Sequence, residues 1–233
     1  MKRASVARYG LWVALPLGVL AAMVMSGWAV GMTWRALGAN ASPLSEAGIG
    51  VALYGVTLGF IMIGERILFS RRITKKDVGL DRSLTWTELG YGVAGFVVML
   101  LVSAVLVTIG RSVFPMVDWG QAQNVGFSNA IFGTDRMFAF MLLVVMAPIA
   151  EEIVFRGYLY DRLRKAKMPL WLMTVVISMA FALIHLQVNV GVVVFVLSVI
   201  ACVLRWRTKS LWPGIILHGM NNLLAFYVTF VLH

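Results

Sequence analysis

Two adjacent carboxylates, Glu151 and Glu152, lie inside a stretch, Arg136–Tyr160, that otherwise has the composition of a membrane-spanning helix. An ionisable residue at the centre of such a helix costs roughly 2.5 kcal/mol or more, so it indicates function by default. Glu152 and Arg156 are four residues apart, share a helix face and are expected to pair. Glu151 points about 100° away and has no partner in its own helix. The spacing therefore predicts one structural carboxylate, Glu152, and one reactive carboxylate, Glu151.

Two further apolar segments carry residue pairs with the same four-residue spacing. Phe181 and His185 share one helix face, and His218 and Asn222 share another. These are two of the three histidines in the chain. A single buried histidine is more often a satisfied core residue than a catalytic one, but two of them in so apolar a chain indicate a site.

The same residues are expected to lie at a similar depth. Glu151 lies 17 residues before Met168 and His185 lies 17 residues after it, so the two are level if a helical hairpin turns there. At 1.5 Å per residue, His218 and Asn222 lie roughly 14–20 Å from the inner side. This predicts one cluster in the inner half of the membrane.

These residue types suit hydrolysis of a peptide bond without a covalent intermediate. A carboxylate beside a neutral histidine can take a proton from water, a role for Glu151 and His185. A second histidine and an amide can donate hydrogen bonds to a developing oxyanion, a role for His218 and Asn222. The chain has no G-x-S-x-G motif, and Cys202 lies outside these segments, so a serine or cysteine nucleophile is not indicated.

A metal site on the same residues is the alternative. Glu151, His185 and His218 could hold zinc and leave a fourth position open. The chain lacks the H-E-x-x-H helix that usually supplies such ligands. We therefore expect no cofactor, with a divalent metal such as zinc as the alternative.

The composition sets this site in a membrane. Of the 233 residues, 61% are hydrophobic and 13% are charged, whereas soluble domains have about 25% charged residues. The net charge of +10 comes from short basic clusters between apolar runs, and neither a glycine-rich phosphate loop nor an RNA-binding pattern is present. We expect an all-α, polytopic membrane bundle whose partners are the lipid bilayer and a peptide or membrane-protein substrate, not nucleic acid.

Seven apolar stretches are long enough, or nearly so, to cross a hydrocarbon core of about 30 Å, and the sixth is the shortest. We expect one integral membrane domain, 1–233, in which residues 1–135 supply accessory helices and an outer loop (111–135). Residues 136–233 form the catalytic core from the last four spans. The expected spans are Tyr9–Trp34, Ala47–Phe69, Glu88–Gly110, Arg136–Tyr160, Pro169–Gln187, Val190–Leu204 and Leu211–Leu232.

Basic residues predict the orientation. With the N-terminus inside, the inner segments hold 15 of the 20 lysines and arginines and the outer segments hold three, while Arg66 and Arg156 lie within spans. This bias follows the positive-inside rule and predicts an N-in, C-out topology. The first apolar run exceeds the ~7–15 residues of a signal-peptide core, so we expect it to be retained.

Three motifs, on the fourth, fifth and seventh expected spans, resemble in order those of the CPBP family. That family comprises CAAX prenyl endopeptidases of the Ras-converting type and bacteriocin-processing or self-immunity membrane proteins, also called the Abi family. The resemblance covers about a third of the chain, Met146 to Asn222. The motifs are Glu151-Glu152-x-x-x-Arg156, Phe181-x-x-x-His185 and His218-x-x-x-Asn222.

The resemblance implies an intramembrane endopeptidase whose site is reached from the cytoplasmic side. By motif position it gives the four candidate catalytic residues the roles described above and makes Glu152, Arg156 and Phe181 supporting residues. It leaves the metal question open, because both metal-dependent and glutamate-dependent mechanisms have been proposed for the family. The short N-terminus looks bacterial, so we expect the inner (cytoplasmic) membrane and a substrate that is not prenylated.

Two other classes of function stay open. A non-catalytic membrane scaffold or bacteriocin-immunity protein could use the same fold for binding. A transporter could relay protons through the intramembrane carboxylates, although the chain gives only weak signs of repeated halves.

Overall fold

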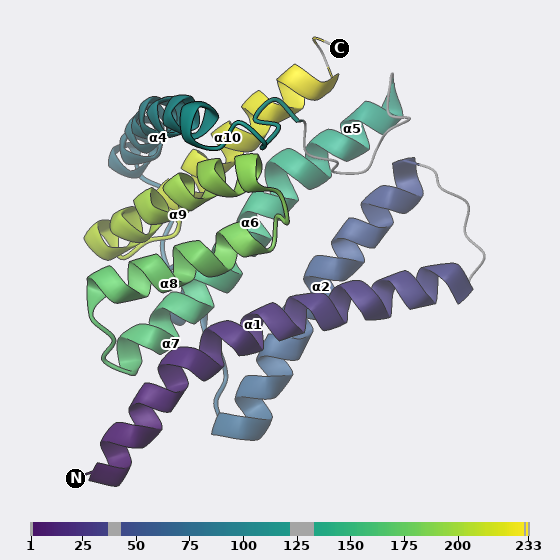
Figure 1. Cartoon of the computed structure of the whole chain (residues 1–233). Helices are drawn as coiled ribbons and strands as arrows, with labels where there is room; N and C mark the ends of the chain where they lie inside the picture. Colours follow the sequence, from purple (N-terminus) through teal and green to yellow (C-terminus); the bar gives the residue numbers. More distant parts are fainter. Residues whose placement is uncertain (1, 37–42, 122–132, 231, 233) are drawn as a thin grey trace.

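In the computed structural model, residues 2–36, 43–121, 133–230 and 232 are described, and they form helices and turns without a β-strand (Figure 1). The predicted all-α bundle is therefore confirmed. Two of the helical elements, η1 and η2, are π-helices. In chain order the elements are α1 (Lys2–Ala36), α2 (Pro43–Phe69), α3 (Lys75–Val78), α4 (Trp86–Val113), α5 (Thr134–Phe140), η1 (Met141–Met146), α6 (Ala147–Glu152), η2 (Ile153–Leu159), α7 (Tyr160–Lys165), α8 (Leu170–Leu183), α9 (Val188–Thr208) and α10 (Trp212–Phe230).

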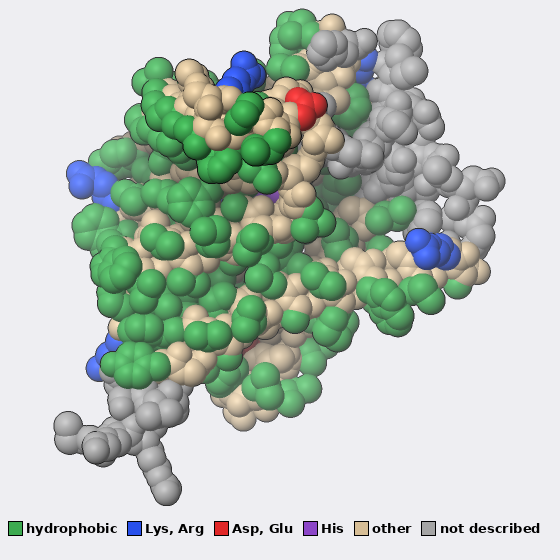
Figure 2. Space-filling model, viewed as in Figure 1, with side chains coloured by type: hydrophobic (Ala, Val, Ile, Leu, Met, Phe, Trp, Pro, Cys, Tyr) green, Lys and Arg blue, Asp and Glu red, His purple; other side chains and the backbone are tan. Residues whose placement is uncertain are grey.

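Five segments of the described chain are long and apolar enough to cross a bilayer, which makes this an integral, multi-pass membrane protein. Helix α10 has 19 residues, but a histidine, a proline and two asparagines lower its mean hydropathy. Figure 2 shows hydrophobic side chains over most of one face of the molecule, with lysines and arginines near its edges. The five segments are Tyr9–Thr33, Gly48–Phe69, Trp86–Val113, Arg136–Lys165 and Val188–Thr208.

The fifth and sixth expected spans, Pro169–Gln187 and Val190–Leu204, differ from the structure in length. Helix α8 has only 14 residues, whereas α9 has 21 and is not the shortest span. Between them the chain reverses through Leu186, which has a positive φ of 55°. The sequence had predicted His185 inside a helix, whereas in the structure it lies in this turn. Neither glycine nor proline marks the turn, so the apolar run gives no signal for it.

The segment that carries both glutamates is one helical run from α5 to α7, which contains the π-helices η1 and η2. Pro148 explains the first of them, because proline has no N–H and its ring clashes with the carbonyl four residues earlier. Just before it, the Ala147 N–H donates to the Leu142 carbonyl, five residues back. That spacing is the π register, which occurs often at functional sites.

Helix α4 packs against α9 and α10, as Figure 1 shows, and so covers the helix that carries His218. A Cβ atom on Gly92 would lie 2.7 Å from the Cβ of Ile216, so only glycine allows this approach. In the interior, Phe155 of η2 and Phe181 of α8 are completely buried with their ring centroids 5.0 Å apart, in a core cluster that also includes residues of α9 and α10. These contacts fix the helices that carry the three motifs relative to one another.

Candidate active site

The ion pair predicted from the four-residue spacing lies in the interior of the bundle. Arg156 Nη1 is 2.8 Å from Glu152 Oε1, and both side chains are fully buried. The guanidinium also lies over the ring of Phe181, 4.4 Å from its centroid. Removing one partner of a buried pair leaves an uncompensated charge, at a cost of about 3–5 kcal/mol. Glu152 and Arg156 therefore form a fixed ion pair against which the groups around them are positioned.

His218 of α10 connects the two glutamates. Its Nδ1 lies 3.3 Å from Glu152 Oε1, and its Nε2 lies 3.7 Å from Glu151 Oε2. The histidine side chain is 3% exposed and that of Glu151 is 12% exposed, so of these two groups the carboxylate of Glu151 is the more accessible. From the sequence, His185 was the expected neighbour of Glu151, whereas the structure places His218 directly opposite it.

Glu151 has a second partner, which the sequence analysis missed. The Tyr54 hydroxyl donates a 2.6 Å hydrogen bond to Glu151 Oε1. Tyr54 lies on α2, 97 residues earlier in the chain. Its hydroxyl needs a hydrogen-bond partner when buried, which was the one available signal, but nothing in the sequence identified that partner.

Phe181 lies between the two motif histidines. Its ring centroid is 5.1 Å from that of His185 and 5.6 Å from that of His218. The Nδ1 atom of His185 is 2.9 Å from the Phe181 carbonyl oxygen. Because a carbonyl only accepts, Nδ1 carries a proton, and Nε2 is an acceptor when the ring is neutral. Because the Arg156 guanidinium also lies over the Phe181 ring, all three motif segments meet around Phe181.

Asn222 completes the π-helical turn of η1. Its Nδ2 donates a 2.9 Å hydrogen bond to the carbonyl of Leu143. The amide five residues after Leu143 belongs to Pro148, which has no N–H, and the Ala147 N–H donates to Leu142 instead. The Asn222 side chain thus supplies a donor that the backbone cannot. One N–H of the same amide is left over from this bond and can serve another acceptor.

The predicted alternative of a zinc site requires three donors that converge on one point. Among the residues that the structure describes, no group of three His, Cys, Asp or Glu side chains could hold a metal ion. The set Glu151, His185 and His218 therefore does not fit zinc in this arrangement.

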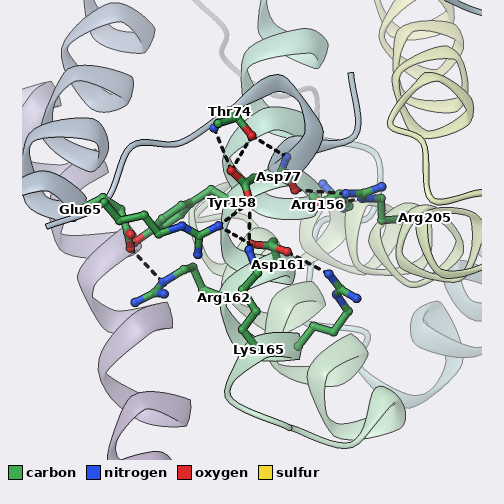
Figure 3. A network of polar contacts seen from close by, with 11 residues as sticks. Glu65, Thr74, Asp77, Arg156, Tyr158, Asp161, Arg162, Lys165 and Arg205 are labelled. Carbon is green, nitrogen blue, oxygen red and sulfur yellow. Dashed lines mark hydrogen bonds and ion pairs between the residues drawn. The ribbon is translucent and has the colours of Figure 1, made fainter. Parts of the chain in front are cut away.

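A second polar network ties the loop between α2 and α4 to α7 (Figure 3). Asp77 of α3 pairs with Lys165 at 2.9 Å and with Arg71, and Lys165 also pairs with Asp161. The Thr74 side chain caps α3 and hydrogen-bonds to Asp77. Partial burial acts to raise the pKa of Asp77, but the hydrogen bonds from Thr74 and Lys165 outweigh it and hold that pKa well below its ordinary value.

Arg205 connects this network to the site. Its Nε donates to the carbonyl oxygen of Arg156 at 3.1 Å, and its Nη2 donates to that of Asp77 at 3.3 Å. Gly79 has a φ of +78°, and a Cβ there would lie 2.3 Å from Nη1 of Arg205. From the sequence, Arg205 is only one of the inner basic residues. In the structure it holds α3 and η2 to α9.

Comparison with known proteins gives matches over this part of the chain. Residues 133–224 match the family described as type II CAAX prenyl endopeptidase Rce1-like. The UPF0177 protein YbdI of Lactococcus lactis subsp. lactis (strain IL1403) is 36% identical over 89 residues, which are 38% of this chain. The match spans 47% of that relative, less than half of its length. No solved structure matches the chain.

Proposed function

We propose, on the premise that residues 133–224 belong to the type II CAAX prenyl endopeptidase Rce1-like family, that this protein is an intramembrane endopeptidase. The match confirms the CPBP resemblance seen in the three motifs, and at the level of the family the activity is that of a CAAX-type protease. The proposed substrate is a peptide or membrane-associated protein. The observation that carries the proposal is the placement of Glu151 Oε2 opposite His218 Nε2, at 3.7 Å, beside a fully buried ion pair.

We propose that His218 is a hydrogen-bond donor to the substrate in this cluster. Each nitrogen of the His218 ring has a carboxylate beside it. The 3.7 Å separation from Glu151 is longer than a hydrogen bond, so the Nε2–H is free to turn to a substrate oxygen.

In the proposed reaction, Glu151 accepts a proton from a water molecule while the water oxygen attacks the peptide carbonyl carbon. Neutral His185 presents Nε2 as an acceptor for the other hydrogen of that water. The oxyanion accepts hydrogen bonds from His218 Nε2–H and from the second N–H of the Asn222 amide. When the C–N bond breaks, Glu151 returns its proton to the leaving amine, and the products are a carboxylic acid and an amine.

We propose that this reaction needs no metal, because Glu151, His185 and His218 do not converge as zinc ligands. Cleavage that stops with 1,10-phenanthroline and resumes with added zinc would overturn this part. The bacterial source of the relative and the predicted orientation support residence in a bacterial inner (cytoplasmic) membrane.

The test is terminal sequencing of cleavage products in membrane vesicles from cells that express the wild type or Glu151→Gln. New amino termini are expected with the wild type and not with Glu151→Gln, provided that both proteins reach the membrane at equal levels. The same termini in both samples would refute the proposal. A cellular phenotype that survives Glu151→Gln without any cleavage would instead indicate a scaffold or immunity protein.

A further inference from the structure

We infer that Tyr54 of α2 is a positioning residue for Glu151, so that the active site extends beyond the segment shared with the family. This inference rests on the endopeptidase activity proposed above. Tyr54 lies outside residues 133–224, yet its hydroxyl makes the shortest contact of the site, 2.6 Å to Glu151 Oε1.

The two oxygens of the Glu151 carboxylate have different neighbours. Tyr54 holds Oε1, and Oε2 faces His218 at 3.7 Å. A neutral hydroxyl that donates to a carboxylate makes one of the stronger hydrogen bonds in proteins. Because one oxygen is held, the plane of the carboxylate is fixed and the other oxygen is directed toward the reacting groups. A general base needs this constraint, since misplacement by a fraction of an ångström slows proton transfer.

The packing of α2 explains why Tyr54 reaches this far. Helix α2 contacts α5, η1 and α6. At Gly50, one turn before Tyr54, a Cβ atom would lie 2.3 Å from Cδ2 of Leu142. Glycine at that position therefore lets the backbone of α2 lie directly against η1. Residues four apart share a helix face, so the same close approach brings Tyr54 to Glu151.

A second tyrosine–carboxylate contact joins the same two helical runs and offers a matched control. Tyr158 of η2 donates a 3.0 Å hydrogen bond to Glu65 Oε1 of α2, and Arg162 pairs with the same oxygen (Figure 3). Tyr54 and Glu65 are 11 residues apart on α2, which places them on one face. Here the tyrosine is on η2 and the carboxylate on α2, the reverse of the Tyr54–Glu151 contact. The Tyr158 contact belongs to the second polar network and not to the site.

The experiment compares Tyr54→Phe, Tyr158→Phe and Glu151→Gln with the wild type, using a peptide that spans the cleavage site found by terminal sequencing. Tyr54→Phe is expected to lower kcat by about ten-fold or more, the effect of losing a hydrogen bond to a charged group, with KM nearly unchanged. Tyr158→Phe is expected to keep the wild-type kcat. A wild-type kcat for Tyr54→Phe would overturn the inference, as would an equal loss in both phenylalanine variants.

A second measurement tests the contact without using activity. Thermal midpoints are measured for Tyr54→Phe, Glu151→Gln and the double variant, and the two changes are expected to be non-additive because they share one hydrogen bond. Additive midpoints would overturn the inference. If Glu151→Gln still cleaves the peptide, the proposed function fails as well. If Tyr54→Phe retains full activity while Glu151→Gln loses it, the inference about Tyr54 fails and the proposed function stands.

Discussion

Asn222→Ala is expected to destabilise the protein by about 1 kcal/mol, because it removes the side-chain donor from the Leu143 carbonyl. The bond is 2.9 Å long and partly buried. Leaving a buried carbonyl unpaired costs about 1–3 kcal/mol, whereas hydrogen bonds between membrane helices are worth about 0.6 kcal/mol on average. The expected value lies between these two figures because the site is neither fully dry nor fully exposed.

Asn222→Ala destabilises the protein because Pro148 has no N–H to bond the Leu143 carbonyl in its place. A second substitution, at Pro148, tests this explanation. Pro148→Ala restores a backbone N–H five residues after Leu143, in the register that η1 already uses. With that donor present, the Leu143 carbonyl no longer depends on the side chain of Asn222. We therefore expect Asn222→Ala to cost clearly less in the Pro148→Ala protein than in the wild type, with a coupling free energy of roughly 0.5–1 kcal/mol.

The measurement is reversible unfolding in mixed micelles of a mild detergent and SDS, for the wild type, both single variants and the double variant. Asn221→Ala is the control, because its amide donates to Asn222 Oδ1 at 3.2 Å and not to the backbone of η1. That control is expected to have the same effect in both backgrounds. Strict additivity of Asn222→Ala and Pro148→Ala would refute the account of the π-helical turn.

The other predictions concern the buried pair and the second network. Arg156→Met is expected to lower the free energy of unfolding by about 3–5 kcal/mol, since it leaves the buried Glu152 without its partner. The double variant Arg156→Met/Glu152→Gln is expected to lose less. Equal losses in the same unfolding assay would argue against the pair. Arg205→Lys replaces the guanidinium, whose Nε and Nη2 bond the carbonyls of Arg156 and Asp77, by a single ammonium nitrogen that lacks this separation of donors. Limited proteolysis is therefore expected to cut the loop around Asp77 faster, with the exposed Arg207→Lys as control, and equal rates would contradict this. The pKa of Asp77 is lowered in the folded state, so its stabilising effect is present above the unfolded value of 3.8 and is lost as the pH falls below it. In Asp77→Asn the thermal midpoint is therefore expected to fall less steeply as the pH is lowered through the acid range. The same pH dependence as in the wild type would count against the hydrogen bonds of Asp77.

Contacts within one helix could be predicted from the sequence, because helical spacing alone fixes which residues share a face. Glu152 and Arg156 pair as expected. The three motif segments also meet, and His185 lies near Phe181. The roles of the catalytic residues stay predictions, and so does the division into accessory and catalytic parts.

Contacts between helices could not be predicted, because they depend on how each helix is rotated about its axis. Tyr54 is one tyrosine in an apolar span, and no spacing rule connects it to Glu151. The bond from Asn222 to Leu143 requires knowing that the helix adopts the π register before Pro148. The early end of α8 depends on a positive φ at Leu186, a conformation that leucine seldom adopts and that no local signal announced.

The adjacency of the two glutamates has a geometric reason that their helix alone does not reveal. Neighbouring side chains diverge by about 100° on a helix, so one carboxylate enters the core while the next faces its edge. A single imidazole can span that divergence, because its two nitrogens point in different directions, and His218 contacts one glutamate through each. Gly214, one turn earlier on α10, makes space for the Glu152 carboxylate, since a Cβ there would lie 2.7 Å from Glu152 Oε2. Moving either glutamate by one position would take it out of reach of this ring, so the pair must be contiguous for one histidine to link the buried charge to the exposed one.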